Sequence, residues 1–272
     1  MLPKIVGFLL NILSFFSSES AARIALELFS IPRKGQVTDE QATFLETAYK
    51  EILFYGNNEI TTYNWLGNRG TILLIHGWES NAGRWSELII NLQNKDFNVV
   101  AMDAPAHGNS GSTIFNVALY AEFINVVSNH FRPTVMIAHS MGGMATAFSI
   151  SKYQNESVQK LILLGVPCKY TDVVTRYTNM MHYNKHIILQ LNKVLIERLG
   201  GPYESFSTAK NLENVYAEVL IIHDETDNII PYSDAILIKN SLENSKFITT
   251  KGLRHSLKDK SVNSQIEEFI HS

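Results

Sequence analysis

A serine between small residues is the first feature of this chain that could do chemistry. Ser140 lies in "IAHSMGG", with Ala138 two positions before it and Gly142 two positions after it. A nucleophilic serine at a sharp strand-to-helix turn, as in the G-x-S-x-G motif, tolerates only small neighbours at these positions. The apolar run "TVMI" before it favours a strand, and "MATAFSI" favours a helix whose N-terminus would stabilise negative charge. Ser140 is therefore a candidate nucleophile if the chain also supplies a base, an acid and an oxyanion site.

A candidate base and acid follow later in the chain. A serine nucleophile needs a base to accept its proton, and His255 in "KGLRHSLKD" lies between the last expected strand and the last helix. The acid that orients the histidine is expected between the two, in the order serine, acid, histidine. The segment "IIHDETDNIIP" offers Asp224, Glu225 and Asp227. We predict Asp227, which lies further into the loop, with Asp224 as the substitute; the carboxylate would fix the imidazole tautomer and stabilise the imidazolium.

The oxyanion site is expected in "LLIHGWES", which follows an early apolar strand. The backbone amide of Trp78 can point at the developing negative charge there, together with the amide of Met141, next to the serine. Each such donor contributes roughly 3 kcal/mol to catalysis. We expect His76 and His139 to hydrogen-bond around this site without taking part in the chemistry.

The other chemical motifs are weak. His182 and His186 have the spacing of a helical metal pair, but "HYNKH" lacks the glutamate of H-E-x-x-H and no third ligand is apparent. We therefore expect surface or cap histidines and no metal site. The chain has neither a G-x-G-x-x-G fingerprint nor a P-loop, and the acyl transfer needs no cofactor, so we expect none.

The elements that must position these residues alternate between short apolar runs and amphipathic stretches. Strands are expected at 70–77, 97–105, 133–140, 158–167, 217–225 and 246–252, with helices at 85–92, 116–131, 141–153, 233–242 and up to the end of the chain. Two further strands, 50–56 and 59–67, are expected to pair around Gly56-Asn57-Asn58. This order predicts an α/β fold: a mostly parallel sheet with helices on both faces and the ligand site at the carboxyl ends of the strands.

Two segments lie outside this pattern. Residues 168–214 contain helical stretches, broken by Gly200-Gly201-Pro202, that we expect to form a small cap insertion over the strand ends. The N-terminal segment Ile5–Phe16 is apolar but too short to span a membrane. A signal peptide fits it poorly, because the basic start is thin and Glu19 falls where cleavage would occur.

We therefore favour two packed or membrane-grazing helices at the N-terminus. The first would bury one shared face, and the second, capped by Ser18 or Ser20, would bury another and end at Pro32. The expected faces are Leu9, Ile12, Leu13 and Phe16 in the first helix, and Ile24, Ala25, Leu28 and Phe29 in the second. Peripheral contact with a membrane through these helices is a hypothesis.

Composition narrows the class of protein. With 272 residues, 45% hydrophobic and 18% charged, the chain can bury a large core. The 23 basic and 26 acidic residues give a net charge of -3, which argues against a nucleic-acid surface. The single cysteine, Cys168, permits no internal disulfide framework. We expect a cytoplasmic location, with membrane association and a signal peptide left open.

Taken together, the motifs resemble those of the α/β-hydrolase fold superfamily. The matching segments are "HGW" at 76–78, "DAPAHGNS" at 103–110, "AHSMG" at 138–142, "HDETDNIIP" at 223–231 and "GLRH" at 252–255. The "HGW" motif is similar to that of small carboxylesterases. The resemblance implies Ser140 as nucleophile, Asp227 as acid, His255 as base, and the Trp78 and Met141 amides as oxyanion hole.

The resemblance also implies how the chain is divided. An α/β-hydrolase core would comprise residues 46–167 and 215–272, with the cap at 168–214 and an N-terminal helical extension at 1–45 outside the match. The departures are Ala138 and Ala106, each in place of a glycine. The segment around Asp103 and His107 would shape the loop beside the serine.

Two classes of function follow. The first is a serine hydrolase that cleaves a small-molecule carboxylic ester or thioester through an acyl-enzyme; the same triad also serves carbon–carbon bond hydrolysis. The second is a ligand-binding or signalling receptor of this fold with little turnover. A complete triad favours the hydrolase.

Overall fold

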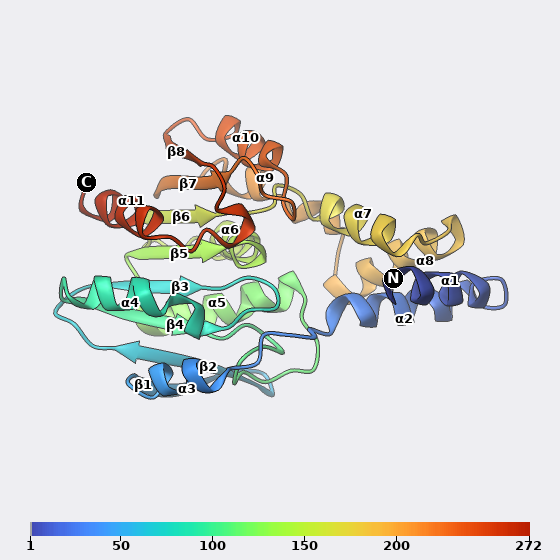
Figure 1. Ribbon diagram of the computed structural model, residues 1–272, viewed down its shortest axis with the longest axis horizontal. Helices are drawn as coiled ribbons and strands as arrows, with labels where there is room; N and C mark the ends of the chain where they lie inside the picture. Colours follow the sequence, from blue (N-terminus) through green and yellow to red (C-terminus); the bar gives the residue numbers. More distant parts are fainter. Residues whose placement is uncertain (1) are drawn as a thin grey trace.

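The fold is built on one eight-stranded sheet, seen in a computed structural model that describes residues 2–272. The strand order is β1-β2-β4-β3-β5-β6-β7-β8 (Figure 1). Their bounds are β1 Tyr49–Tyr55, β2 Asn58–Trp65, β3 Arg69–Ile75, β4 Phe97–Met102, β5 Val135–His139, β6 Lys160–Leu164, β7 Glu218–Asp224 and β8 Ser245–Thr250. Strand β2 runs antiparallel to both its neighbours, and the other five pairings are parallel.

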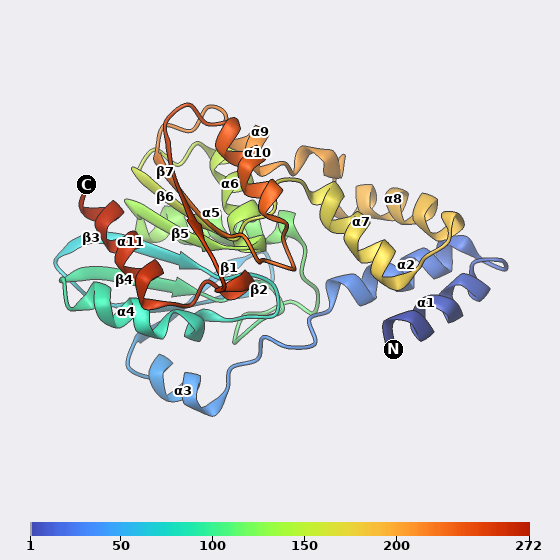
Figure 2. The same cartoon turned by 45° about the horizontal axis from the view of Figure 1, so that its top comes forward.

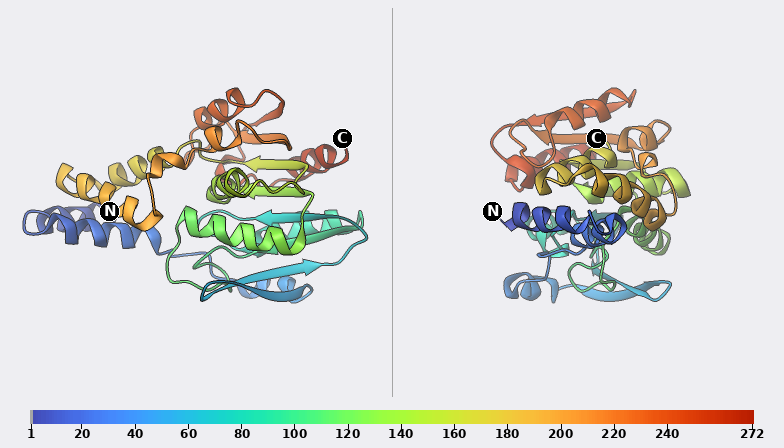
Figure 3. Two further views of the ribbon diagram at one scale, coloured as in Figure 1. Left: turned by 180° about the vertical axis from the view of Figure 1, so that it is seen from behind. Right: turned by 90° about the vertical axis from the view of Figure 1, so that its right-hand side faces the viewer.

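Helices cover both faces of this sheet. On one face lie α4 (Ser86–Gln93) and α11 (Lys260–His271); on the other lie α5 (Val117–Phe131), α6 (Met141–Tyr153), α9 (Thr208–Leu212) and α10 (Tyr232–Asn240). The first pair is in front in Figure 1, and α5 and α6 are in front in the reverse view of Figure 3. A short helix, α3 (Asp39–Leu45), precedes β1, and the 3-10 turns are η1 Ala82–Trp85, η2 Tyr203–Ser205 and η3 Arg254–Ser256.

The pleat of the central strands divides the core in two. In β3, Leu73 and Ile75 pack toward α5 and α6, whereas Ile72 and Leu74 pack toward α4 and α11. All four side chains are fully buried. A strand buried on both faces must be apolar at successive positions, which explains the unbroken run "ILLI".

The α/β fold expected from the sequence is confirmed. The register Tyr55↔Asn58 joins β1 and β2 across the expected turn. Helix α6 has the expected bounds, and α4 buries Leu88, Ile89 and Leu92 as expected.

Four helices form a separate layer beyond the carboxyl ends of the central strands, which we call the helical lobe (Figures 1 and 2). They are α1 (Leu2–Leu13), α2 (Ser18–Ser30), α7 (Tyr170–Met181) and α8 (Lys185–Leu199). Helix α2 packs against α8, and α1 packs against α2 and α7. The lobe has its own small core of Leu10, Ala21, Ala25, Tyr177, Met181, Tyr183 and Ile187. Segments that are far apart in sequence thus share one lobe.

The buried face predicted for the first helix was wrong for three of its four residues; Leu13 is partly buried against the helical lobe. Leu9, Ile12 and Phe16 are 58%, 43% and 87% exposed, whereas Leu10 and Ser14 are buried. Polar and steric contacts decide which face of α1 packs, and hydrophobic spacing in the sequence does not reveal these contacts. Asn11 Nδ2 donates to the His182 carbonyl at 2.8 Å, and the Asn184 amide donates to Asn11 Oδ1 at 2.8 Å. A Cβ on Gly7 would lie 1.7 Å from the Met181 carbonyl oxygen, so only glycine permits this approach.

The second helix also differs in detail. Its N-cap is Ser17, whose side chain accepts from the Ser20 amide, and not Ser18 or Ser20. Ile24 is 39% exposed, and Leu28 and Phe29 are only partly buried. The tightest packing falls on Ala21, Ala22, Ala25 and Leu26. Small side chains allow a close approach to α8, so alanine marks the contact face better than isoleucine does.

No helix within residues 2–272 is both long enough and apolar enough to cross a membrane.

Candidate active site

Ser140 occupies a strained turn between β5 and α6. Its φ of 53° and ψ of -127° are rarely adopted by a residue with a side chain. The Ser140 amide donates to the Leu164 carbonyl of β6 at 2.9 Å, which anchors the turn to the sheet. A Cβ on Gly142 would lie 2.3 Å from the His76 carbonyl oxygen. The small residue after the serine is thus needed because α6 starts against the β3 loop.

Three side chains from separate loops form one hydrogen-bond chain. His255 Nε2 lies 3.0 Å from Ser140 Oγ, and His255 Nδ1 lies 2.7 Å from Asp227 Oδ2. The serine follows β5, the aspartate follows β7, and the histidine lies in η3 after β8. With Nδ1–H donating to the carboxylate, Nε2 is left as the acceptor for the serine hydroxyl. The structure therefore brings together the three residues that the sequence singled out.

The carboxylate of Asp227 is held from several sides. Its Oδ1 accepts from the amides of Ile229 and Ile230 at 2.8 and 2.9 Å, and His223 Nε2 lies 3.4 Å from Oδ2. Burial alone would raise the pKa of Asp227, but hydrogen bonds from His223 and His255 outweigh it and lower the pKa below its usual value. Asp227 is therefore ionised at neutral pH and can stabilise a positively charged His255.

Asp224, the substitute candidate, does not contact His255. Its two oxygens accept from Thr226 and Thr250, and from the amides of Gly252 and Leu253 at 3.3 and 2.9 Å. Desolvation opposes ionisation, but these hydrogen bonds lower the pKa of Asp224 below its usual value. Asp224 therefore fastens the start of the loop that carries His255.

The two predicted oxyanion donors lie next to the serine. Neither the Trp78 amide nor the Met141 amide donates to a protein acceptor within residues 2–272. Gly77 packs so closely on the turn that a Cβ there would lie 2.8 Å from Ser140 Cβ. His76 fixes this loop, because Nδ1–H donates to the Gly77 carbonyl at 2.7 Å. The Met141 amide therefore directly follows the serine, and the Trp78 amide follows the glycine that packs on the serine turn.

Sequence reasoning missed the role of Arg84, which lies in η1. Its Nη2 donates to the Ser256 carbonyl at 2.9 Å, and its Nη1 donates to His139 Nδ1. Because a guanidinium can only donate, His139 carries its proton on Nε2 and donates it to the His255 carbonyl at 2.8 Å. Arg84 and His139 therefore hold two successive carbonyls of the histidine loop.

Burial lowers the pKa values of both Arg84 and His139. Burial lowers the pKa of Arg84 to about 9, so the guanidinium is still charged at neutral pH. The pKa of His139 lies well below its usual value because of burial and, next, the charge of Arg84. His139 is thus a neutral bridge, as expected of a histidine that supports the site without doing its chemistry.

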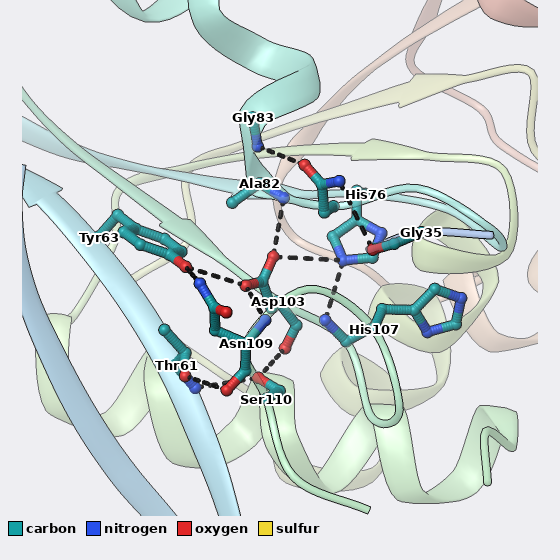
Figure 4. A network of polar contacts seen from close by, with 12 residues as sticks. Gly35, Thr61, Tyr63, His76, Ala82, Gly83, Asp103, His107, Asn109 and Ser110 are labelled. Atoms are coloured by element: carbon teal, nitrogen blue, oxygen red, sulfur yellow. Dashed lines mark hydrogen bonds and ion pairs between the residues drawn. The ribbon is translucent and has the colours of Figure 1, made fainter. Parts of the chain in front are cut away.

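A buried network around Asp103 supports η1 and the neighbouring loops (Figure 4). Asp103 Oδ1 accepts from the Ala82 amide at 2.8 Å, and Oδ2 accepts from the Asn109 amide at 2.9 Å and the Tyr63 hydroxyl at 3.2 Å. Burial raises the pKa of Asp103 to about 6. His107 Nε2 accepts from the Glu79 amide at 2.9 Å, beyond the "HGW" motif. The network joins β2, β4 and η1, the turn that carries Arg84.

His182 and His186 do not form a helical pair. His182 is the C-cap of α7 with a φ of 54°, and His186 lies in the first turn of α8. Their i, i+4 spacing therefore spans the break between two helices.

Comparison with known proteins gives a consistent result. A sequence model of the α/β hydrolase fold matches residues 70–184. A bifunctional esterase/perhydrolase of Acinetobacter calcoaceticus is 22% identical over 256 residues, covering 74% of this chain and 91% of that protein.

Solved structures resemble the whole architecture. A membrane phospholipase A, described as a bacterial virulence factor, has a TM-score of 0.64 at 16% identity and covers 85% of this chain and 92% of its own. The thioesterase domain of the curacin biosynthetic pathway has a TM-score of 0.61 at 18% identity, with 83% and 99% covered. The sheet order and these matches show that the chain has the α/β-hydrolase fold.

Proposed function

We propose that this protein is a cofactor-independent serine hydrolase that cleaves a carboxylic ester or thioester. The observation that carries the proposal is the continuous hydrogen-bond chain from Asp227 through His255 to Ser140, at 2.7 and 3.0 Å. A serine at a strained turn, an imidazole with a free acceptor nitrogen and an ionised carboxylate are the three parts that acyl transfer to serine requires.

In the proposed reaction, Ser140 Oγ attacks the carbonyl carbon while His255 Nε2 takes the hydroxyl proton. The Trp78 and Met141 amides donate to the negative oxygen of the tetrahedral intermediate. Collapse expels the alcohol or thiol, which receives the proton from His255, and leaves an acyl-enzyme. Water, deprotonated by His255, then attacks the acyl carbon and releases the acid and Ser140.

The comparisons support hydrolysis and leave the substrate open. The names of the relatives include an esterase/perhydrolase and a thioesterase domain, and those activities belong to those proteins. The low identities carry the fold and not a substrate. Carbon–carbon bond hydrolysis and a receptor with little turnover are the alternatives on this fold.

The test is turnover of p-nitrophenyl esters from acetate to long-chain acyl groups by the natural protein and by Ser140→Ala. A matched control is Ser149→Ala, because Ser149 is a buried serine of the same helix whose hydroxyl has no partner. We expect multiple turnovers by the natural protein and the control, and a loss on the order of 10⁴ or more in kcat for Ser140→Ala.

The outcomes separate the alternatives. Activity that survives in Ser140→Ala would remove Ser140 from the mechanism. Natural protein that is folded, is stabilised by an ester analogue and does not turn over any ester would instead support the receptor.

A further inference from the structure

The outer side of α1 exposes an unusual number of large apolar side chains. We call this set the α1 face. It comprises Ile5, Phe8, Leu9, Ile12, Phe15 and Phe16, which are 51%, 63%, 58%, 43%, 74% and 87% exposed. Single exposed apolar residues are normal on protein surfaces, but a contiguous group marks a binding site. The last two residues lie in the turn between α1 and α2.

Within residues 2–272 this face is largely uncovered, apart from the Phe15 ring, which lies against His186. The spacing of three and four residues places Ile5, Phe8, Leu9 and Ile12 on one side of the helix. The opposite side is occupied by the contacts of Gly7, Leu10 and Asn11 with α7 and the α7–α8 turn. Since α1 is fixed in the lobe by its inner side, it cannot roll to bury its outer side.

The apolar surface continues onto α8. The Phe15 ring lies against His186, with ring centroids 6.1 Å apart. Leu189, one turn further along α8, is 62% exposed. The surface therefore spans two helices of the lobe.

The charges around the face are compatible with an anionic surface. Residues 1–18 contain no Asp or Glu, and Lys4 is their only charged side chain. Lys185 is exposed at the start of α8. Glu19, the first acidic residue, pairs with Arg23 at 2.9 Å, and the same guanidinium lies 3.4 Å from Glu197.

Shape and size favour a lipid surface over a second copy of the chain. The α1–α2 turn lies at the end of the molecule farthest from the sheet, so its two phenylalanines sit on a protruding tip (Figures 1 and 2). A stable protein interface uses about 20 to 30 residues on each side, many more than this face offers. A protruding apolar tip close to the exposed Lys185 can instead enter the headgroup region of a bilayer, which needs no matching shape.

We propose that the α1 face binds the surface of a lipid bilayer that carries anionic headgroups. The helical lobe lies beyond the carboxyl ends of the strands, at the same end of the sheet as Ser140. Bound in this way, the protein takes its ester from the lipid phase, and this second part rests on the proposed hydrolase function.

The test is co-sedimentation of the full chain with vesicles of phosphatidylcholine mixed with phosphatidylglycerol. The variant Phe15→Ser/Phe16→Ser removes the two most exposed side chains of the face. The matched control is Leu66→Ser/Tyr216→Ser, because Leu66 and Tyr216 are 75% and 104% exposed but lie outside the lobe. Thermal unfolding midpoints establish that each variant is folded.

We expect the natural protein and the control to sediment with the vesicles, and the Phe15→Ser/Phe16→Ser variant to lose about tenfold or more in partition coefficient. Equal partition of both variants, or no binding by the natural protein, would overturn the proposal. A natural protein that is dimeric in light scattering, binds no vesicles and becomes monomeric in Phe15→Ser/Phe16→Ser would assign the face to a second copy. Because sedimentation needs no turnover, failure here is distinct from failure of the hydrolase proposal.

Discussion

Two aspartates three residues apart illustrate how environment divides roles at the residue scale. Asp224 ends β7 and Asp227 lies in the loop that follows it, and hydrogen bonds lower the pKa of each. Only Asp227 contacts the His255 ring, whereas Asp224 binds backbone amides at the start of the His255 loop. One acid is placed to orient the imidazole and the other to fasten the chain that carries it.

Neutralising each aspartate therefore has a different expected result. Asp227→Asn should lower kcat on the order of 10⁴, because an amide does not enforce the required tautomer or stabilise the imidazolium. Asp224→Asn should act chiefly on stability, by about 1 to 3 kcal/mol, because an NH2 group replaces one of the two oxygens that accept from the loop. Kinetics on one soluble ester, together with urea unfolding of both variants, measure the two effects. If the two variants lost the same factor in kcat and had the same free energy of unfolding, the two aspartates would not have these different roles.

Where a local pattern defines the position, the residues that the sequence singled out are those that the structure brings together. Ser140 and His255 occupy positions that small neighbours and the strand order define. The choice of Asp227 depended on loop position, and only the geometry separates it from Asp224. The role of Arg84 gave no local signal, because its partners His139 and Ser256 are 55 and 172 residues away.

The buried His139 should make stability depend on pH. Its folded pKa is lowered, so below about pH 6.5 the unfolded chain binds a proton that folded His139 does not. This contribution to stability is complete above pH 6.5 and is lost as the pH falls, at up to about 1.4 kcal/mol per pH unit. His139→Gln keeps a donor and an acceptor but does not titrate. Urea unfolding from pH 5 to 8 should give a shallower slope for the variant, and identical slopes would contradict the assignment.

At the scale of elements, the histidine loop is held by neighbours rather than by its own structure. The turn η3 has only three residues; its first residue, Arg254, and its C-cap, Leu257, have positive φ values of 56° and 51°. The carbonyls of His255 and Ser256 are bonded to His139 and Arg84. Arg84 in η1 and His139 at the end of β5 therefore determine where the imidazole of His255 lies.

Removing the guanidinium should impair positioning more than substrate binding. We expect Arg84→Gln to lower kcat by about tenfold, with KM nearly unchanged, because the loss of these charge-assisted hydrogen bonds costs about 1.5 kcal/mol. Arg84→Lys keeps a charged donor and should recover part of the rate. A change confined to KM, or no recovery with lysine, would refute a positioning role.

Element boundaries were most predictable where a strong local sequence pattern marked them. The strands of the central sheet are apolar on both faces, and α6 follows the serine motif directly. The N-terminal helices were harder because α1 is apolar on nearly every side. Its inner face was selected by Gly7 and Asn11, through steric fit and hydrogen bonds that hydrophobic spacing does not encode.

For the whole molecule, Gly7 marks a close contact between distant parts of the chain. A Cβ there would lie 1.7 Å from the Met181 carbonyl oxygen, whereas a Cβ on Gly201 would meet no atom within 4 Å. Gly7→Ala should therefore lower the stability of the helical lobe by about 1 to 3 kcal/mol. Gly201→Ala is the matched control.

Hydrogen exchange resolves this effect by region. We expect faster exchange in α1 and in its contacts with α7 for Gly7→Ala, and unchanged exchange in the sheet. Equal exchange in the two glycine variants would show that α1 does not depend on this contact.

The composition of the helical lobe also has a consequence for biosynthesis. Helices α1 and α2 end at Ser30, but their partners α7 and α8 begin only at Tyr170. At translation rates of about 5 to 20 residues per second, the first apolar helices wait roughly 10 to 30 seconds for the chain that covers their inner side. During that interval both sides of α1 are uncovered on the ribosome. The nascent chain therefore exposes the most apolar surface of α1 before most of the sheet has been synthesised, so the order of synthesis favours early contact with a chaperone or a lipid surface.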